Sequence, residues 1–331
     1  MEEMAEINEL IQSEQPKVVK TLAMIGQRLV GQQHVAKRLV MALLSEGHVL
    51  LEGLPGLAKT TAVKALGDVS DLAVSRVQFT PDLLPADVIG TQIYDPKKGE
   101  FNVKKGPIFA NLVIADEINR APAKVQSALL EAMQERRVTI GDETHTLTQP
   151  FLVMATQNPI EQEGTYALPE AQTDRFLFKV KVGYLSLEEE REMMARITQL
   201  AHGEETPLDR VLSADDILSI QRLTRKIHVS DKVRDYVVRL VFATRHPENF
   251  GLKDLKGLIS YGASPRASIN FEKAGRVAAF MDGRAFVGPQ DIKDVAYDIL
   301  RHRILPSYEA EADGIDAGSL VERILNSIDV P

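Results

Sequence analysis

Eight residues in the first part of this chain restrict its fold more than any other stretch. They run from Gly53 to Thr60, between a short apolar segment at 48–51 and a segment with a helical pattern at 61–66. A strand, a glycine-rich loop and a helix in this order bring backbone N–H groups and the positive end of a helix dipole to one point. The stretch therefore predicts a polyphosphate site, in which Lys59 reaches the β- and γ-phosphates and the Thr60 hydroxyl binds Mg²⁺.

The glycine-rich loop is expected to hold the nucleotide through its own residues and the one that follows. These are Gly53, Leu54, Pro55, Gly56, Leu57, Ala58, Lys59, Thr60 and Thr61. Ala58 stands where the common pattern has glycine, and since a positive φ is costly for alanine we expect a negative one. A turn that binds nothing is the alternative, and a second motif weighs against it. Ahead of the loop, Gly31 and Gln32 form either the N-terminal turn of the next helix or a wall beside the adenine base.

Composition and charge narrow the function further. The chain of 331 residues is 44% hydrophobic and 26% charged, which is ordinary for a globular protein. Its net charge of −8 argues against a protein that binds mainly by neutralising nucleic-acid phosphates. The absence of cysteine excludes thiolate nucleophiles and cysteine-ligated metal sites, and fits a reducing compartment. The acidic N-terminus and the lack of any apolar run of about 18 residues indicate a cytoplasmic protein without a membrane span.

The second motif is an apolar segment, 111–117, that ends in two carboxylates. Parallel sheets present the carboxyl ends of their strands to a ligand crevice. Asp116 is therefore expected to hold Mg²⁺ as a hard oxygen ligand, and Glu117 to polarise the attacking water. A strand that simply meets solvent is the alternative, but the glycine-rich loop earlier in the chain favours the catalytic interpretation.

Three further polar residues permit both a structural and a functional interpretation. Asn158 follows the apolar segment 151–156 and either bonds a γ-phosphate and the attacking water or forms a turn before the next proline. Arg175 lies at the end of a short predicted helix, and Arg266 at the start of a longer one. Taken alone, both arginines are typical of ordinary solvated side chains.

The pattern of helices and strands divides the chain in two. Residues 1–185 are expected to form an α/β domain with N-terminal helices and a parallel sheet, and residues 186–331 a helical domain without strands. The first domain carries an insertion near 80–106 and a hairpin near 136–150 that turns at 141–143. The tip of that hairpin is acidic, which weighs against an element that tracks DNA.

Taken together, the motifs resemble those of the AAA+ ATPases, and within them the MoxR family. Their order and spacing are specific, and Ala58 is usual in that family. The resemblance extends roughly from residue 25 to 305 and is carried by the segments 53–60, 115–122, 126–135, 155–159, 170–176 and 263–267. It implies a P-loop NTPase core with a three-layer αβα arrangement and a parallel sheet, followed by an all-α lid domain.

The resemblance also implies roles for single residues. Asp116 looks like the magnesium-holding acid and Glu117 like the residue that activates water. Asn158 resembles the sensor of the γ-phosphate. Arg266 resembles a second sensor, which the lid brings to the nucleotide of the same subunit.

The remaining role is that of an arginine that projects into the ATP site of the neighbouring subunit. Arg175 resembles such an arginine finger. Arg120, Arg136 and Arg137 stay open as alternatives, because they also lie near the interface that the resemblance implies. The insertion and the hairpin near 136–150 would face substrate or partner.

Members of this family are ring-shaped, often hexameric, ATPases that hydrolyse ATP with Mg²⁺ and act like chaperones. They mature or activate partner proteins, often ones with a von Willebrand factor A domain, and metal-cofactor loading recurs among them. A ring-forming nucleic-acid translocase, a chelatase-type motor subunit and a nucleotide-gated platform that barely hydrolyses ATP are the rival interpretations.

Overall fold

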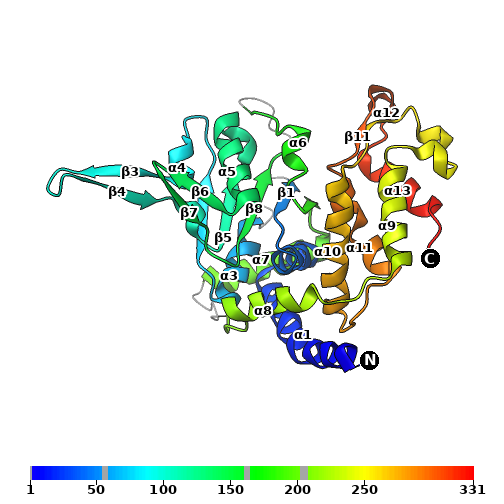
Figure 1. The fold of residues 1–331 in the computed structure, drawn as a ribbon, viewed down its shortest axis with the longest axis horizontal. Coiled ribbons are helices and arrows are strands. Elements are labelled where there is room, and N and C mark those ends of the chain that lie inside the picture. The colour runs from blue at the N-terminus through cyan, green and yellow to red at the C-terminus, as the bar shows by residue number, and fades with distance from the viewer. Residues whose placement is uncertain (1, 54–58, 160–164, 202–207) are drawn as a thin grey trace. The chain divides into compact units, whose positions relative to one another are not determined.

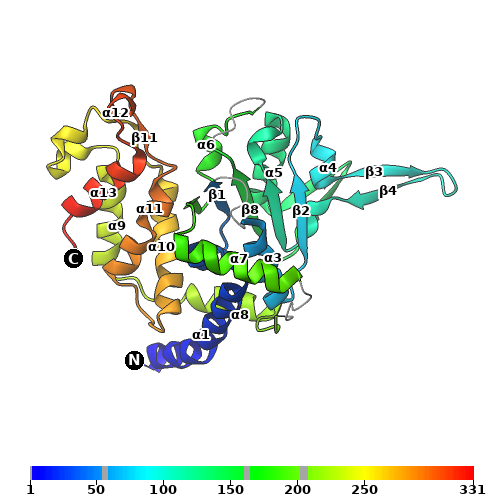
Figure 2. The ribbon, with the colours of Figure 1, turned by 180° about the vertical axis from the view of Figure 1, so that it is seen from behind.

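The computed structural model describes residues 2–53, 59–159, 165–201 and 208–331 (Figures 1 and 2). It consists of two compact units. The sheet unit comprises Lys17–Arg175 and Val180–Leu218, and the helical unit comprises Met1–Pro16, Phe176–Lys179 and Ser219–Pro331. This division differs from the single boundary that we expected between residues 185 and 186. The first helix, one strand and a later helix each run from one unit into the other.

A five-stranded sheet forms the centre of the sheet unit, with the strand order β2-β5-β8-β1-β9. Its strands are β1 (Val49–Gly53), β2 (Val74–Gln78), β5 (Leu112–Asp116), β8 (Leu152–Gln157) and β9 (Phe178–Val182). The pairs β2–β5, β5–β8 and β1–β8 are parallel. The inner strands β5 and β8 are buried along nearly their whole length, as expected for strands covered on both faces. The predicted parallel sheet is confirmed.

Helices surround this sheet, and their buried apolar residues recur at helical spacing along the sequence. Val35, Leu39 and Leu43, which share one helical face in the sequence, are all buried. The helices are α2 (Gln33–Leu44), α3 (Lys59–Ser70), α5 (Ala123–Glu135), α6 (Glu170–Thr173) and α7 (Leu187–Ala201), with α1 (Glu2–Arg28) and α8 (Ala214–Thr224) shared between the two units.

Two hairpins extend the sheet unit. The short helix α4 (Pro85–Ile89) leads into a ribbon that projects away from the sheet, formed by β3 (Gly90–Asp95) and β4 (Glu100–Lys105) (Figures 1 and 2). The second hairpin pairs β6 (Arg137–Ile140) with β7 (Glu143–Thr146). The second hairpin is found where the sequence predicted one, and the first lies within the predicted insertion near 80–106. The second turn is tighter than expected, since Glu143 already pairs with Ile140.

The helical unit contains four long helices, α9 (Asp231–Ala243), α10 (Pro265–Met281), α11 (Pro289–Leu300) and α13 (Ala317–Ser327), and the short α12 (Tyr308–Ala312). The expectation of a domain without strands is wrong in one detail. A small antiparallel ribbon pairs β10 (Ile259–Tyr261) with β11 (Leu305–Pro306). Strands of this length are too short for alternation of apolar and polar residues to reveal them.

The turn that follows α11 is hydrogen-bonded to the chain that enters β9, within the helical unit. His302 lies with Nε2 3.2 Å from the carbonyl oxygen of Phe176, and Nη2 of Arg303 donates to the same oxygen at 2.6 Å. Nη1 of Arg303 also donates to the Leu177 carbonyl at 3.4 Å. Arg303 is only 7% exposed, so a buried guanidinium holds the carbonyls of Phe176 and Leu177.

Burial of His302 predicts a pH dependence of stability. Desolvation and, secondarily, the charge of Arg303 hold the pKa of its imidazole well below the ordinary value of 6.5. Below that pH the unfolded chain binds a proton that the native chain does not, so the free energy of unfolding falls by at most about 1.4 kcal/mol per pH unit.

Urea unfolding measured between about pH 8 and pH 5 should therefore show decreasing stability towards acid. A His302→Gln variant should show a shallower slope than the unaltered chain, because the group that titrates differently in the two states is gone. Equal slopes in the two proteins would mean that His302 does not contribute to the pH dependence.

Candidate nucleotide-binding and hydrolysis site

The glycine-rich loop lies between the elements that the sequence predicted. β1 ends at Gly53 and α3 begins at Lys59. A Cβ at Gly53 would come within 2.6 Å of the Val182 carbonyl oxygen, so close approach of β9 requires glycine there. Thr60 is partly buried and Thr61 exposed in the first turn of α3. Leu54, Pro55, Gly56, Leu57 and Ala58, whose φ we expected to be negative, lie outside the described residues, as does the side chain of Lys59.

Asp116 ends β5 and is 14% exposed. Its Oδ1 accepts a hydrogen bond from the Thr156 hydroxyl at 2.6 Å. Its Oδ2 accepts from Arg76, with Nη2 at 2.5 Å and Nε at 3.1 Å. Both partners come from neighbouring strands, so the register of the sheet fixes the direction of this carboxylate.

Glu117 follows in the left-handed backbone conformation, with φ 56° and ψ 52°. Its N–H donates to Thr156 Oγ1 at 2.8 Å, and its Oε2 accepts from Gln78 Nε2 at 2.7 Å and from Arg120 Nη1 at 3.1 Å. A residue other than glycine pays about 1–2 kcal/mol for this backbone conformation, and such strain concentrates at functional sites. The carboxylate is therefore held from the backbone and from two side chains.

One hydroxyl, that of Thr156, joins both carboxylate residues. Thr156 is 2% exposed, donates to Asp116 and accepts from the Glu117 N–H. A Thr156→Val variant keeps the shape but removes both bonds. We expect turnover to fall by about 10- to 10²-fold, because small misplacements of reacting groups are costly, while ATP binding changes far less.

The matched control for this variant is Thr148→Val, whose hydroxyl donates to the Phe109 carbonyl at 2.8 Å outside the site. Turnover and ATP affinity are measured for both. Unchanged turnover in Thr156→Val would show that the hydroxyl does not position the carboxylates.

The donors at this edge of the sheet fit a magnesium nucleotide. Mg²⁺ in phosphoryl-transfer sites usually takes one or two carboxylates together with phosphate oxygens and water. The Asp116 carboxylate and the Thr60 hydroxyl are donors of that kind. Since a carboxylate offers about four lone-pair sites, the bonds from Thr156 and Arg76 leave room for a metal bond.

Residues after Glu117 are fixed by a buried glutamine that the sequence analysis did not single out. Gln126, in α5, is fully buried, and its Nε2 donates to the carbonyls of Ile118 at 3.2 Å and Ala121 at 3.1 Å. A third bond, 3.1 Å long, reaches the Tyr166 carbonyl. The available signal was a polar residue beside the apolar face of a predicted helix. Arg76, Gln78 and Thr156 had no comparable signal.

Asn158 follows β8 directly and is 7% exposed, at the same edge of the sheet as Asp116 and Glu117. Gly31 and Gln32 stand before α2. Gln32 occupies the N-cap position without a capping bond from its side chain, and its Nε2 instead donates to the Gly183 carbonyl at 3.4 Å. The role of this pair beside adenine stays a prediction.

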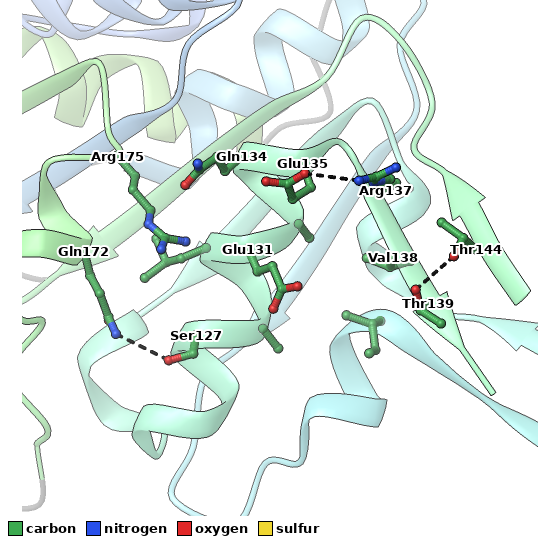
Figure 3. A pocket seen from close by; sticks show the side chains of 14 residues that line it. Ser127, Glu131, Gln134, Glu135, Arg137, Val138, Thr139, Thr144, Gln172 and Arg175 are labelled. Atoms are coloured by element: carbon green, nitrogen blue, oxygen red, sulfur yellow. Dashed lines mark hydrogen bonds and ion pairs between the residues drawn. The ribbon is translucent and has the colours of Figure 1, made fainter. Parts of the chain in front are cut away.

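Arg175 lines a pocket of about 820 Å³ between α5, α6 and the β6–β7 hairpin. Figure 3 shows Arg175 beside Gln134, Glu131 and Gln172 around this hollow. The Nε atom of Arg175 is buried and has no hydrogen-bond partner among the residues that the structure describes.

The alternative arginines have partners of their own. Arg120 pairs with Glu117 at 3.1 Å, and Arg136 pairs with Glu46 at 2.9 Å. Arg137, which shares the pocket of Arg175, lies 3.5 Å from Glu135. Arg266 is exposed in the first turn of α10, in the helical unit, where its N–H donates to Ser264 Oγ at 3.2 Å.

A parallel sheet with a glycine-rich loop after β1 and two carboxylates after β5 defines a P-loop nucleoside triphosphatase. Residues 48–178 match the family described as the ATPase family associated with various cellular activities (AAA), and residues 255–324 match the AAA lid domain. Among the part of the chain that the structure describes, no helix is long and apolar enough to cross a membrane.

Similar proteins narrow the family assignment further. The chain is 52% identical over 304 residues to Chaperone MoxR1 of Mycobacterium tuberculosis, covering 92% of this chain and 79% of the relative. It is 32% identical over 323 residues to Protein MoxR of Paracoccus denitrificans, covering 92% and 93%. A crystal structure of an ATPase candidate from Cytophaga hutchinsonii ATCC 33406 superposes with a TM-score of 0.93 at 48% identity, covering 100% of both chains.

The chain therefore belongs to the MoxR family of AAA+ ATPases, as its motifs predicted. Its activity is that of a chaperone-like ATPase.

Proposed function

We propose that this protein is a Mg²⁺-dependent ATPase that assembles into a hexameric ring and uses ATP to remodel, mature or load metal cofactors into client proteins, including clients with a von Willebrand factor A domain. The observation that carries the hydrolytic part is the fixed pair of carboxylates. Asp116 and Glu117 share the Thr156 hydroxyl at the carboxyl edge of the parallel sheet.

The chain's own groups divide the work of hydrolysis. Asp116 and Thr60 would hold Mg²⁺, which when bound neutralises charge on the phosphates. Glu117 orients the attacking water, and Lys59 and the loop N–H groups hold the β- and γ-phosphates. Asn158 contacts the γ-phosphate from the end of β8.

Two arginines complete the site in this proposal. Arg175 acts on the nucleotide of the neighbouring subunit, and Arg266 on the nucleotide of its own subunit. An arginine supplied in trans stabilises charge in the transition state and is worth about 10³- to 10⁵-fold in rate. A lone subunit should therefore hydrolyse ATP slowly.

The projecting β3–β4 ribbon is the part of the sheet unit that we assign to clients. It exposes an aromatic pair, with Tyr94 53% and Phe101 66% exposed and their ring centroids 5.2 Å apart. Exposed aromatic side chains are enriched at protein interfaces. We also assign the acidic tip of the β6–β7 hairpin, which carries Asp142 and Glu143, to contacts with clients.

A ring-forming nucleic-acid translocase is the main rival, and the β3–β4 ribbon is also the element that favours it. Lys97 and Lys98 at its turn, beside the aromatic pair, form the combination of cations and rings that binds single strands. The net charge of −8 and the acidic second turn support a protein client instead. DNA affinity that decreases steeply with salt would favour the rival. A chelatase-type motor differs from our proposal only in its client.

The test is the ATP hydrolysis rate measured against protein concentration, with light scattering on the same samples. Specific activity that rises steeply as the scattering mass approaches a ring is the expected result. Activity that is independent of concentration in a monomer would contradict a site shared between subunits. An assembled ring without turnover would indicate a nucleotide-gated platform.

A further inference from the structure

The boundary between the two units falls on the peptide bond that follows Arg175. Arg175 is the last residue of a segment of the sheet unit, and Phe176 is the first of a short segment that belongs to the helical unit. The side chain of Arg175 lies in a pocket formed by residues of the sheet unit. The backbone of Arg175 therefore continues directly into the helical unit, while its side chain lies among residues of the sheet unit.

The helical unit holds Phe176 at one atom with two side chains. The Phe176 carbonyl oxygen accepts from Arg303 Nη2 at 2.6 Å and lies 3.2 Å from His302 Nε2. Arg303 also donates to the carbonyls of Leu177 and Ile299. Hydrogen bonds from a charged donor are roughly twice as strong as neutral ones, and losing one inside a protein leaves a buried acceptor unsatisfied.

The chemistry of His302 adds to this contact. Its ring is buried, and because a carbonyl oxygen can only accept, the Nε2 atom donates in this contact. Two donors on one carbonyl oxygen fix both the position and the plane of the peptide between Phe176 and Leu177, one residue beyond Arg175. These bonds tie the peptide to the turn that follows α11.

We infer that Arg303, assisted by His302, is a positioning residue for Arg175: by holding the carbonyl of the next residue, it fixes where Arg175 is placed. This inference rests on the proposed action of Arg175 in the neighbouring subunit. Loss of the contact should act through Arg175, by misplacing it, and should spare the subunit's own ATP site.

The first test compares Arg303→Gln with Arg301→Gln. Arg301 is the matched control, because the structure places its bonds to Tyr297 and Asp298 inside its own helical segment. Arg303→Gln should lower kcat by about 10²-fold, as expected for a misplaced catalytic group, with the KM for ATP unchanged. Arg301→Gln should turn over ATP like the unaltered protein.

Mixed rings separate positioning from simple loss of structure. Lys59→Ala subunits retain Arg175, so they should restore hydrolysis at the intact ATP sites of Arg303→Gln subunits. Arg175→Ala subunits should not restore it, since neither subunit then offers a placed arginine. Restored hydrolysis on mixing Arg303→Gln subunits with Arg175→Ala subunits would overturn the inference. So would a second result, in which Lys59→Ala subunits restore hydrolysis to Arg175→Ala subunits but not to Arg303→Gln subunits.

A second readout does not depend on hydrolysis. The chain contains no cysteine, so Ala171→Cys introduces one exposed thiol on α6 for a spin label. The mobility of the label should rise in Arg303→Gln and stay unchanged in Arg301→Gln. Unchanged mobility in Arg303→Gln overturns the positioning role. A different result would overturn the proposed trans role instead: Lys59→Ala subunits fail to restore hydrolysis to Arg175→Ala subunits, while the label is more mobile in Arg303→Gln. Arg303 would then remain the residue that fixes this segment.

Discussion

Replacement of Glu117 by glutamine is expected to leave ATP bound and assembly intact while turnover falls by about 10²- to 10⁴-fold, the usual contribution of a general base. Glutamine keeps the size of the side chain and can still bond to Gln78, and the backbone bond to Thr156 is unaffected. What is lost is the negative charge and the ability to accept a proton from water. The defect should therefore lie in kcat alone.

Phosphate release and retention of labelled ATP measure the two halves of this prediction on one sample. Glu322→Gln, an exposed position on α13, removes an equal charge in the helical unit and should hydrolyse ATP normally. Hydrolysis by Glu117→Gln at the rate of this control would remove Glu117 from the catalytic machinery.

Arg175→Ala carries the second large effect. If the arginine acts in trans, rings made only of Arg175→Ala subunits should lose about 10³- to 10⁵-fold in rate, because charge in the transition state is no longer stabilised. Lys59→Ala rings should be inactive for a different reason, since they do not hold the phosphates. Mixing the two inactive proteins should partly restore hydrolysis, at sites where an intact loop meets an intact arginine.

The control is the double variant Lys59→Ala, Arg175→Ala in one chain, which should restore nothing when it is mixed with Arg175→Ala subunits. Arg137→Ala tests the neighbour that lines the same pocket. Mixtures that assemble but show no hydrolysis would count against Arg175, and the same rescue pattern for Arg137→Ala would transfer the role to that residue.

Local signals in the sequence were sufficient for most of the fold. α10 begins at Pro265, as expected, because proline fixes φ and Ser264 caps the first turn. The ends of β5 and β8 were predictable from apolar runs that stop at polar residues. The β10–β11 ribbon was not, since a pair of such short strands depends on contacts between distant residues. The division by compactness could not be read from the sequence, because three of its crossings lie inside regular elements.

For the site, the sequence predicted the groups and the structure adds what holds them. Asp116 and Glu117 were predicted as site residues because their apolar segment follows a glycine-rich loop in the same chain, and their catalytic roles stay predictions. Arg76 and Gln78 could not be predicted, because their contacts depend on β2 lying beside β5 in the sheet. Strand order is a property of the folded chain that no local pattern encodes.

The ion pair between Arg76 and Asp116 determines how the site would fill. Asp116 is already neutralised by a guanidinium at 2.5 Å. A free Mg²⁺ ion would have to bind beside this positively charged guanidinium and shed part of its own tightly held hydration shell at the same time. An ion that arrives already coordinated to ATP has exchanged some of that water for phosphate oxygens beforehand. If Mg²⁺ is the cofactor, as we propose, a side chain on β2 would therefore favour a metal that enters together with the nucleotide.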